Sequence, residues 1–206
     1  MHELPSQKEW TLKEIFVLSA IGVVFAPLSM AWINVWAFAT LVLGPIGLDV
    51  VFGFWFAVSI VCASIFRKPG VAFVAGMIGA VVQIPLGSPS GVWLIATGLV
   101  QGAGAEFAFF LTRYKNFRLP VLMFAGVTTA WFSFVYNWFR FGYQELGFGL
   151  LITMLVIRSL SGAFLGGVVG KVIADGLAAT GVLASFPLGK ELRSRLRKRV
   201  HENATS

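Results

Sequence analysis

The sequence predicts an all-α polytopic membrane protein, and three observations lead to this class. Hydrophobic residues make up 57% of the chain and charged residues only 12%, about half the charged share of a soluble domain. Long runs contain no charge at all, and a helix crosses a bilayer in about 20 apolar residues. The runs do not alternate polar and apolar residues, which argues against a transmembrane barrel. The charge-free runs are 15–48, 50–66, 69–105 and 119–139.

The first of six expected spans covers residues 13–31. Pro27 should kink its outer end, which a span tolerates when neighbouring helices satisfy the freed carbonyl. The small residues of Gly22-x-x-x-Ala26 leave room for another helix to pack closely. The next segment, 32–48, contains the helix breaker Gly44-Pro45-Ile46-Gly47. We therefore expect 32–48 to be an outer loop with a short interfacial helix.

The other five spans follow from their apolar runs and from the turns that end them. Arg67-Lys68-Pro69-Gly70 ends the second span, and Gly87-Ser88-Pro89-Ser90-Gly91 separates the third from the fourth. Together the six spans form a single membrane domain over residues 1–206, with a basic tail at 188–206. The five spans are, in order, 49–66, 71–86, 91–112, 119–141 and 147–174.

The basic residues are distributed unevenly, which predicts that both termini are cytoplasmic. The loops after the second and fourth spans carry two and three Lys or Arg residues, and the segment 190–199 carries six, out of 16 in the chain. Basic residues accumulate in cytoplasmic loops. The net charge of +7 is therefore better explained by membrane topology and contact with anionic lipid than by binding to nucleic acid.

The sequence lacks the residues that catalytic or metal chemistry requires. The single cysteine, Cys62, lies in an apolar run, and His2 and His201 lie at the two ends. We therefore expect no metal site, no cofactor and no catalytic residue. The chain has no Gly-x-x-x-x-Gly-Lys-[Ser/Thr] motif for ATP. These absences indicate a binding subunit that relies on other proteins for energy.

Polar residues within the spans predict a small-molecule site that opens outward. A polar group inside a span usually has a function or a partner. Trp93, Thr97 and Gln101 share one stripe of the fourth span, and Tyr136 and Asn137 lie in the outer part of the fifth. An aromatic-lined cavity with a few polar groups is typical of a small-molecule site. The predicted substrate-binding residues are Asp49, Gln83, Trp93, Gln101, Glu106, Tyr136 and Asn137.

The same residues also have structural interpretations. Tyr136 could belong to an interfacial aromatic belt, and Gln101 and Asn137 could hydrogen-bond neighbouring helices. Glu106 lies deep in its span and could reach Arg158 of the last span. A buried pair of that kind is structural more often than functional.

Several sequence runs, in order along nearly the whole chain, are typical of one known family. They are Ile65-Phe66-Arg67-Lys68-Pro69-Gly70, Leu86-Gly87-Ser88-Pro89-Ser90-Gly91, Val100-Gln101-Gly102-Ala103-Gly104-Ala105-Glu106, Leu119-Pro120-Val121-Leu122-Met123, 155–163, Thr180-Gly181-Val182-Leu183 and Leu188-Gly189-Lys190-Glu191-Leu192. In these runs the chain resembles the YkoE family of six-helix substrate-capture (S) components of energy-coupling factor (ECF) transporters.

This resemblance implies a substrate, partners and a location. The substrate would be thiamine or its hydroxymethylpyrimidine (HMP) precursor. The partners would be a transmembrane coupling subunit and two ATP-binding-cassette (ABC) ATPases, with which the chain would share the plasma membrane of a prokaryote. The resemblance also implies that the S component topples within the lipid bilayer to release its substrate inward.

The chain departs from the family pattern in two places. Some members carry carboxylates where this chain has Gly76 and Gln83. Without them, Asp49, Glu106 and aromatic faces would have to hold the cationic thiazolium ring of thiamine. The missing carboxylates therefore favour a neutral pyrimidine over intact thiamine as the ligand, because its ring nitrogens and amino group suit Gln and Asn. In addition, Gly22-x-x-x-Ala26 stands where S components commonly show an Ala-x-x-x-Ala pair for docking the coupling subunit.

Two other functional classes compete with an S component. A membrane-embedded enzyme for a small apolar-aromatic substrate would use Glu106 and Arg158, but no paired acids or nucleophile–base pair accompanies them. An ion-coupled carrier would work without ATPases, but the chain shows no internal repeat of the kind many carriers have. The leading prediction is a substrate-capture component that is not an enzyme.

Overall fold

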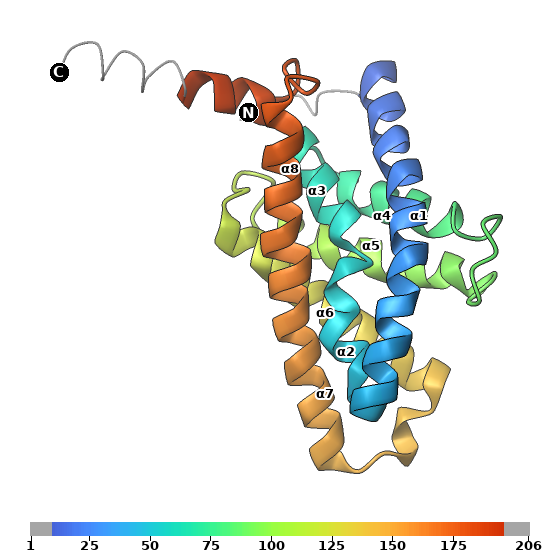
Figure 1. Ribbon diagram of the computed structural model, residues 1–206. Coiled ribbons are helices and arrows are strands. Elements are labelled where there is room, and N and C mark those ends of the chain that lie inside the picture. The colour runs from blue at the N-terminus through green and yellow to red at the C-terminus, as the bar shows by residue number, and fades with distance from the viewer. Residues whose placement is uncertain (1–9, 196–206) are drawn as a thin grey trace, which may run out of the picture.

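Every regular element in the described part of the chain is helical (Figure 1). The structure is a computed structural model that describes residues 10–195. Four stretches are long and apolar enough to cross a membrane, and Val71–Val81 is a shorter apolar helix. The first stretch turns back at Gly44, so six passes result and the predicted all-α membrane class is confirmed. The four long stretches are Leu12–Phe66, Trp93–Leu111, Leu119–Phe141 and Phe148–Ala179.

The first helix, α1 (Leu12–Leu43), is much longer than predicted. Thr11 and Glu14 form a capping box at its N-terminus, and Pro27 lies inside it without ending it. The expectation of an outer loop at 32–48 is wrong, because the chain stays helical as far as Gly44. Gly44 adopts a φ of 61°, which suits glycine, and ends the helix there.

The second pass is interrupted and lies against α1. Trp32 of α1 donates its indole N–H to the Val51 carbonyl at 3.0 Å and stacks on Phe54 at 4.3 Å between ring centroids. A Cβ on Gly47 would lie 2.4 Å from the Ala39 backbone, so only glycine allows this close return. The pass consists of η1 (Gly44–Ile46), α2 (Gly47–Val51), η2 (Phe52–Phe54) and α3 (Ala57–Phe66).

Three helices form the third to fifth passes and lie within the predicted spans. They are α4 (Val71–Val81), α5 (Trp93–Leu111) and α6 (Leu119–Phe141). The short η3 (Tyr143–Glu145) leads into the last pass, which consists of α7 (Phe148–Ser161), the π-helical segment η4 (Gly162–Val169) and α8 (Gly170–Ala179). A further helical stretch covers 187–195.

Glycines let α6 and the last pass touch backbone to backbone. A Cβ on Gly126 of α6 would lie 2.0 Å from the Gly162 carbonyl oxygen, and a Cβ on Gly162 would lie 2.4 Å from that of Gly126. Small residues at such crossings permit the close packing that holds membrane helices together. The two passes are therefore fixed relative to each other at the point where η4 begins.

A fully buried ion pair joins α2 to α7. Arg158 Nε donates to Asp49 Oδ1 at 2.5 Å, and Arg158 Nη2 donates to the Tyr143 hydroxyl at 3.1 Å. The guanidinium also lies 4.4 Å from the Phe52 ring centroid and 5.3 Å from that of Phe134. The suggested pairing of Arg158 with Glu106 is therefore wrong, because the interrupted second pass brings Asp49 to Arg158 instead.

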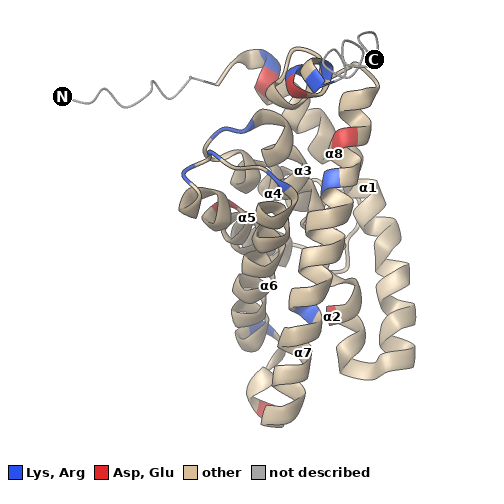
Figure 2. Cartoon of the chain, turned by 90° about the vertical axis from the view of Figure 1, so that its left-hand side faces the viewer, with Lys and Arg blue, Asp and Glu red and all other residues tan. Residues whose placement is uncertain are grey.

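Charged side chains gather mainly at one end of the bundle (Figure 2). α1 begins and α8 ends at this end (Figure 1), which also carries the loops after α3 and α5. The arrangement is the one that the positive-inside bias describes, and the cytoplasmic assignment of this end stays a prediction. His2, His201 and the part of the basic tail beyond residue 195 lie outside the described residues.

We predict that Arg158→Met destabilises the protein strongly. The substitution leaves the Asp49 carboxylate buried without its ion-pair partner, which costs about 3–5 kcal/mol. Thermal unfolding of the purified chain in detergent should show a clearly lower midpoint. The double variant Asp49→Leu/Arg158→Met removes both charges and should recover much of the loss. A single variant that unfolds at the wild-type temperature would contradict this role for the pair.

We also predict that Gly126→Ala disturbs the crossing of α6 and η4. The added methyl group meets the Gly162 carbonyl and forces the two passes apart, at a cost of about 1–3 kcal/mol or more. Gly149→Ala is a matched control, since Gly149 lies in α7 and a methyl group added there would meet nothing within 4 Å. We expect a lower unfolding midpoint for Gly126→Ala only. Equal midpoints in the two variants would argue against a close backbone contact between α6 and η4.

Candidate functional site

A cavity of about 110 Å³ lies between the first five passes, at the end opposite the basic loops. The turn between α4 and α5 lies over it, with Ser88, Pro89 and Ser90 in its lining. The volume is several times what one water molecule needs. The other lining residues are Ile33, Trp36, Leu48, Phe52, Trp55, Gly76, Ala80, Gln83, Leu94, Thr97, Gln101, Ser133, Tyr136, Asn137, Arg140 and Phe141.

Buried polar side chains from three helical passes face this cavity. Gln83 donates its amide N–H to the Gly79 carbonyl at 2.8 Å, so its amide oxygen is available to a ligand. Gln101 is buried, and its side chain makes no hydrogen bond to the part of the chain that the structure describes. Asn137 is also buried and lines the cavity.

Two further lining residues each carry a fully buried polar atom that has no partner within residues 10–195. These are the indole N–H of Trp36 and the hydroxyl of Ser133. Buried polar atoms are nearly always hydrogen-bonded, so an unpartnered one calls for a water molecule or a ligand. One of these two side chains comes from α1 and the other from α6.

Aromatic rings form much of the cavity wall. Trp36 and Trp55 meet edge to face at 6.2 Å between ring centroids, and Phe52 lies 6.5 Å from Trp55. Tyr136 and Phe141 close the other side. Such a wall suits a flat heteroaromatic ring, and its faces can also attract a cation.

Arg140 is the one charged residue that the described part of the chain contributes to the cavity lining. Its guanidinium lies 4.9 Å from the Phe141 ring centroid and 5.9 Å from that of Tyr136. Arg140 also donates to the Thr97 hydroxyl at 3.3 Å. These contacts hold a positive charge at the cavity, and no carboxylate of the described residues lines it.

The structure brings four of the seven predicted site residues together. Gln83, Gln101, Tyr136 and Asn137 all line the cavity. Trp93 does not, because its side chain is 58% exposed and packs beside Arg140. Asp49 does not line the cavity either, since it is fully buried against Arg158.

Glu106 lies far from the cavity, near the basic end of the bundle. Its carboxylate accepts hydrogen bonds from the backbone N–H groups of Gly70 (2.6 Å) and Phe73 (3.2 Å) and from the Tyr114 hydroxyl (2.6 Å). Burial and the neighbouring carboxylate raise the pKa of Tyr114. Glu106 thus satisfies N–H groups at the start of α4, which have no partner within the helix.

Sequence reasoning missed the aromatic half of the cavity. Trp36 falls in the segment predicted to be a loop, and Phe52 and Trp55 fall where the second pass breaks. The aromatic richness of 32–56 was a signal, but only the observed fold turns these rings toward Gln101 and Asn137. Ser133 was not missed in this way, because it lies one helical turn before Asn137, and this spacing indicates a shared polar stripe on the span.

Comparisons with known proteins agree with this architecture. Residues 13–132 match the family described as ABC-type cobalt transport system, permease component. The chain is 45% identical over 198 residues to YkoE of Bacillus subtilis (strain 168), proposed to be an HMP/thiamine permease protein, with 96% of this chain and 99% of that protein covered. A solved structure, described as the crystal structure of an S-component of ECF transporter, aligns with a TM-score of 0.90 over 95% of this chain and 98% of that chain, at 45% identity.

These similarities cover nearly the full length of both chains. They confirm that the protein is a multi-pass membrane component of a bacterial transporter and that its family is not one of enzymes. An S component works with the other subunits of an ECF transporter, and the six-helix fold described above is the one shared with the solved S-component structure. The chain therefore belongs to the YkoE family of S components of ECF transporters.

Proposed function

We propose that this chain captures HMP or thiamine from outside the cell in the cavity formed by the first five passes. The observation that carries the proposal is the combination of two amide side chains with unused hydrogen-bonding groups, Gln83 and Gln101, and aromatic walls in one cavity. The similarity to a protein described as an HMP/thiamine permease supports the same ligand class.

The aminopyrimidine ring shared by both ligands matches the polar groups of the cavity. This ring has two nitrogen acceptors and one exocyclic amino group that donates. The free amide oxygen of Gln83 can accept from the amino group, and the amides of Gln101 and Asn137 can donate to the ring nitrogens. The ring itself would lie between the aromatic walls near Trp55.

The thiazolium ring of thiamine would have to be held without a carboxylate. Asp49 is already paired with Arg158, and Glu106 lies at the other end of the bundle with three hydrogen bonds of its own. Aromatic faces such as that of Trp36 remain as the source of cation attraction. The aminopyrimidine ring is therefore the principal determinant of binding, and neutral HMP needs no cation site.

Transport would require a coupling subunit and two ABC ATPases as partners, since the chain has no motif for ATP. The small pair Gly22-x-x-x-Ala26 is not available for docking them. A Cβ on Gly22 would lie 2.7 Å from Ile78 of α4, and Ala26 is fully buried. The coupling subunit would have to meet exposed residues of α1 instead, such as Phe16 and Val24.

We predict that Gln101→Ala and Asn137→Ala each weaken ligand binding up to about tenfold. Each substitution removes a hydrogen bond to the aminopyrimidine ring, worth about 0.5–1.5 kcal/mol. Quenching of tryptophan fluorescence, titrated with HMP and with thiamine on the detergent-purified chain, measures the affinity. Gln144→Ala is the control, because Gln144 is exposed and does not line the cavity.

Three results would overturn parts of this proposal. Unchanged affinity in both variants would remove the assigned site, and the absence of any response to either ligand would remove the ligand class. Binding of the isolated thiazolium moiety as tightly as HMP would show that the aminopyrimidine ring is not the determinant.

We further predict that Glu106→Gln leaves the affinity for HMP unchanged but lowers the unfolding midpoint. The carboxylate holds Gly70, Phe73 and Tyr114 through hydrogen bonds and does not reach the cavity. A neutral amide accepts these bonds more weakly. Thermal unfolding and fluorescence titration of the same sample separate the two effects, and a loss of affinity with an unchanged midpoint would return Glu106 to the binding site.

A further inference from the structure

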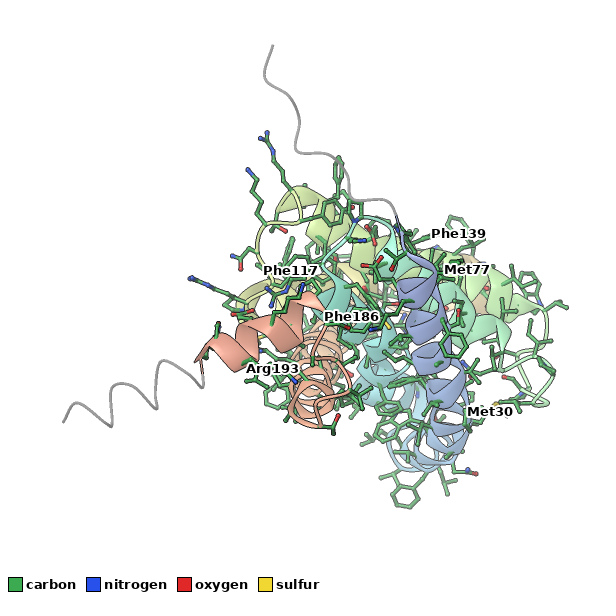
Figure 3. The ribbon with its side chains drawn as sticks, turned by 90° about the horizontal axis from the view of Figure 1, so that it is seen from above. Met30, Met77, Phe117, Phe139, Phe186 and Arg193 are labelled. Atoms are coloured by element: carbon green, nitrogen blue, oxygen red, sulfur yellow. The ribbon has the colours of Figure 1, made fainter. Side chains whose placement is uncertain are left out.

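A second cavity, of about 380 Å³, lies at the basic end of the bundle. Its walls come from the end of α3, the loop between α5 and α6, α8 and the helical stretch 187–195. Figure 3 looks down on this end and labels Phe117, Phe186 and Arg193 there. The lining residues are Arg67, Lys115, Asn116, Phe117, Arg118, Leu119, Lys171, Asp175, Leu188, Glu191, Leu192 and Arg195.

Positive charge predominates in this lining, with five basic and two acidic side chains. Both acidic side chains are already engaged. Glu191 is paired with Arg67 and Arg195, and the hydrogen bond from Arg67 is the main reason that the pKa of Glu191 is lowered. Asp175 is paired with Lys171 at 2.8 Å.

Two basic residues of the cavity, both on the α5–α6 loop, have no acidic partner within residues 10–195. They are Lys115 and Arg118. The loop that carries them is held in place: the Phe117 ring stacks on Phe109 at 5.2 Å between centroids, and the Asn116 side chain accepts from the Arg118 backbone N–H at 3.0 Å. The two cations are thus presented by an anchored segment at a polar cavity.

We propose that this cavity binds the phosphate of an anionic phospholipid headgroup. Basic pockets between transmembrane helices bind anionic headgroups, and the guanidinium of Arg118 can hold two phosphate oxygens at once. Exposed apolar side chains lie near the lining residues in the sequence, and acyl chains can run along such side chains. Val172, beside Lys171 on α8, is 66% exposed, and Leu111 at the end of α5 is 53% exposed. A free phosphate would gain nothing from this apolar border.

The test uses the full-length chain in zwitterionic detergent and short-chain lipids as probes. Dioctanoyl phosphatidylglycerol should bind saturably, whereas dioctanoyl phosphatidylcholine should not, as measured by native mass spectrometry and by microscale thermophoresis. Lys115→Gln/Arg118→Gln should weaken binding of the anionic lipid by roughly fivefold for each lost cation, because a basic residue near anionic lipid contributes about that factor.

Lys190→Gln/Arg193→Gln is the matched control. It removes the same charge from the same end of the bundle, and neither residue lines the cavity, so it should keep most of the affinity. Equal losses in the two double variants would overturn the proposal in favour of unspecific attraction. Glycerol phosphate binding as tightly as the lipid would overturn the lipid assignment, and so would equal binding of the two lipids. Unchanged HMP affinity and unfolding midpoint in Lys115→Gln/Arg118→Gln would show that its fold is intact.

Discussion

The rest of the structure depends on the fully buried pair of Asp49 and Arg158. Two charges removed from water are costly unless each meets a partner in good geometry, and a lipid environment makes an unpaired charge more costly still. The pair therefore fixes where the interrupted second pass meets α7. Phe52 packs against the Arg158 guanidinium and also lines the cavity with Gln101 and Asn137, so the geometry of that cavity depends on the position of this ion pair.

The two ends of the bundle carry different chemistry, and the packing of the helices explains the separation. At the end opposite the basic loops, Gln83, Gln101 and Asn137 come from three passes to a cavity that no described carboxylate lines. At the basic end, Glu106 closes the start of α4, and the loops present Lys and Arg. The acid at the basic end accepts hydrogen bonds from the backbone, whereas the amide side chains at the other end line a cavity and keep hydrogen-bonding groups unused.

The sequence was sufficient for the fold class and for the helices that end at clear signals. The span at 119–141 was bounded by charged loops and the span at 91–112 by a Gly-Ser-Pro turn and a charged loop, and α6 and α5 lie within them. The expectation of a loop at 32–48 was wrong because glycine and proline at 44–45 mark a turn but do not show how far the preceding helix extends. Gln101 and Asn137 could be found from helical spacing, whereas Trp36 and Trp55 could not, since their meeting depends on a long-range return of the chain. Arg158 was assigned to Glu106 on depth alone, and depth does not determine which side of a helix faces which neighbour.

The π-helical segment η4 has a consequence for how the last pass can change over evolution. A π-helical turn holds more residues than an α-helical turn. The side chains of α8 therefore point in other directions about the axis of the pass than they would if α7 continued as an unbroken α-helix. Arg158 on α7 can then face the interior while Lys171 on α8 faces the basic cavity. The two halves of this pass, α7 and α8, can therefore change in sequence separately. Substitutions in α7 need not alter which residues of α8 face the basic cavity.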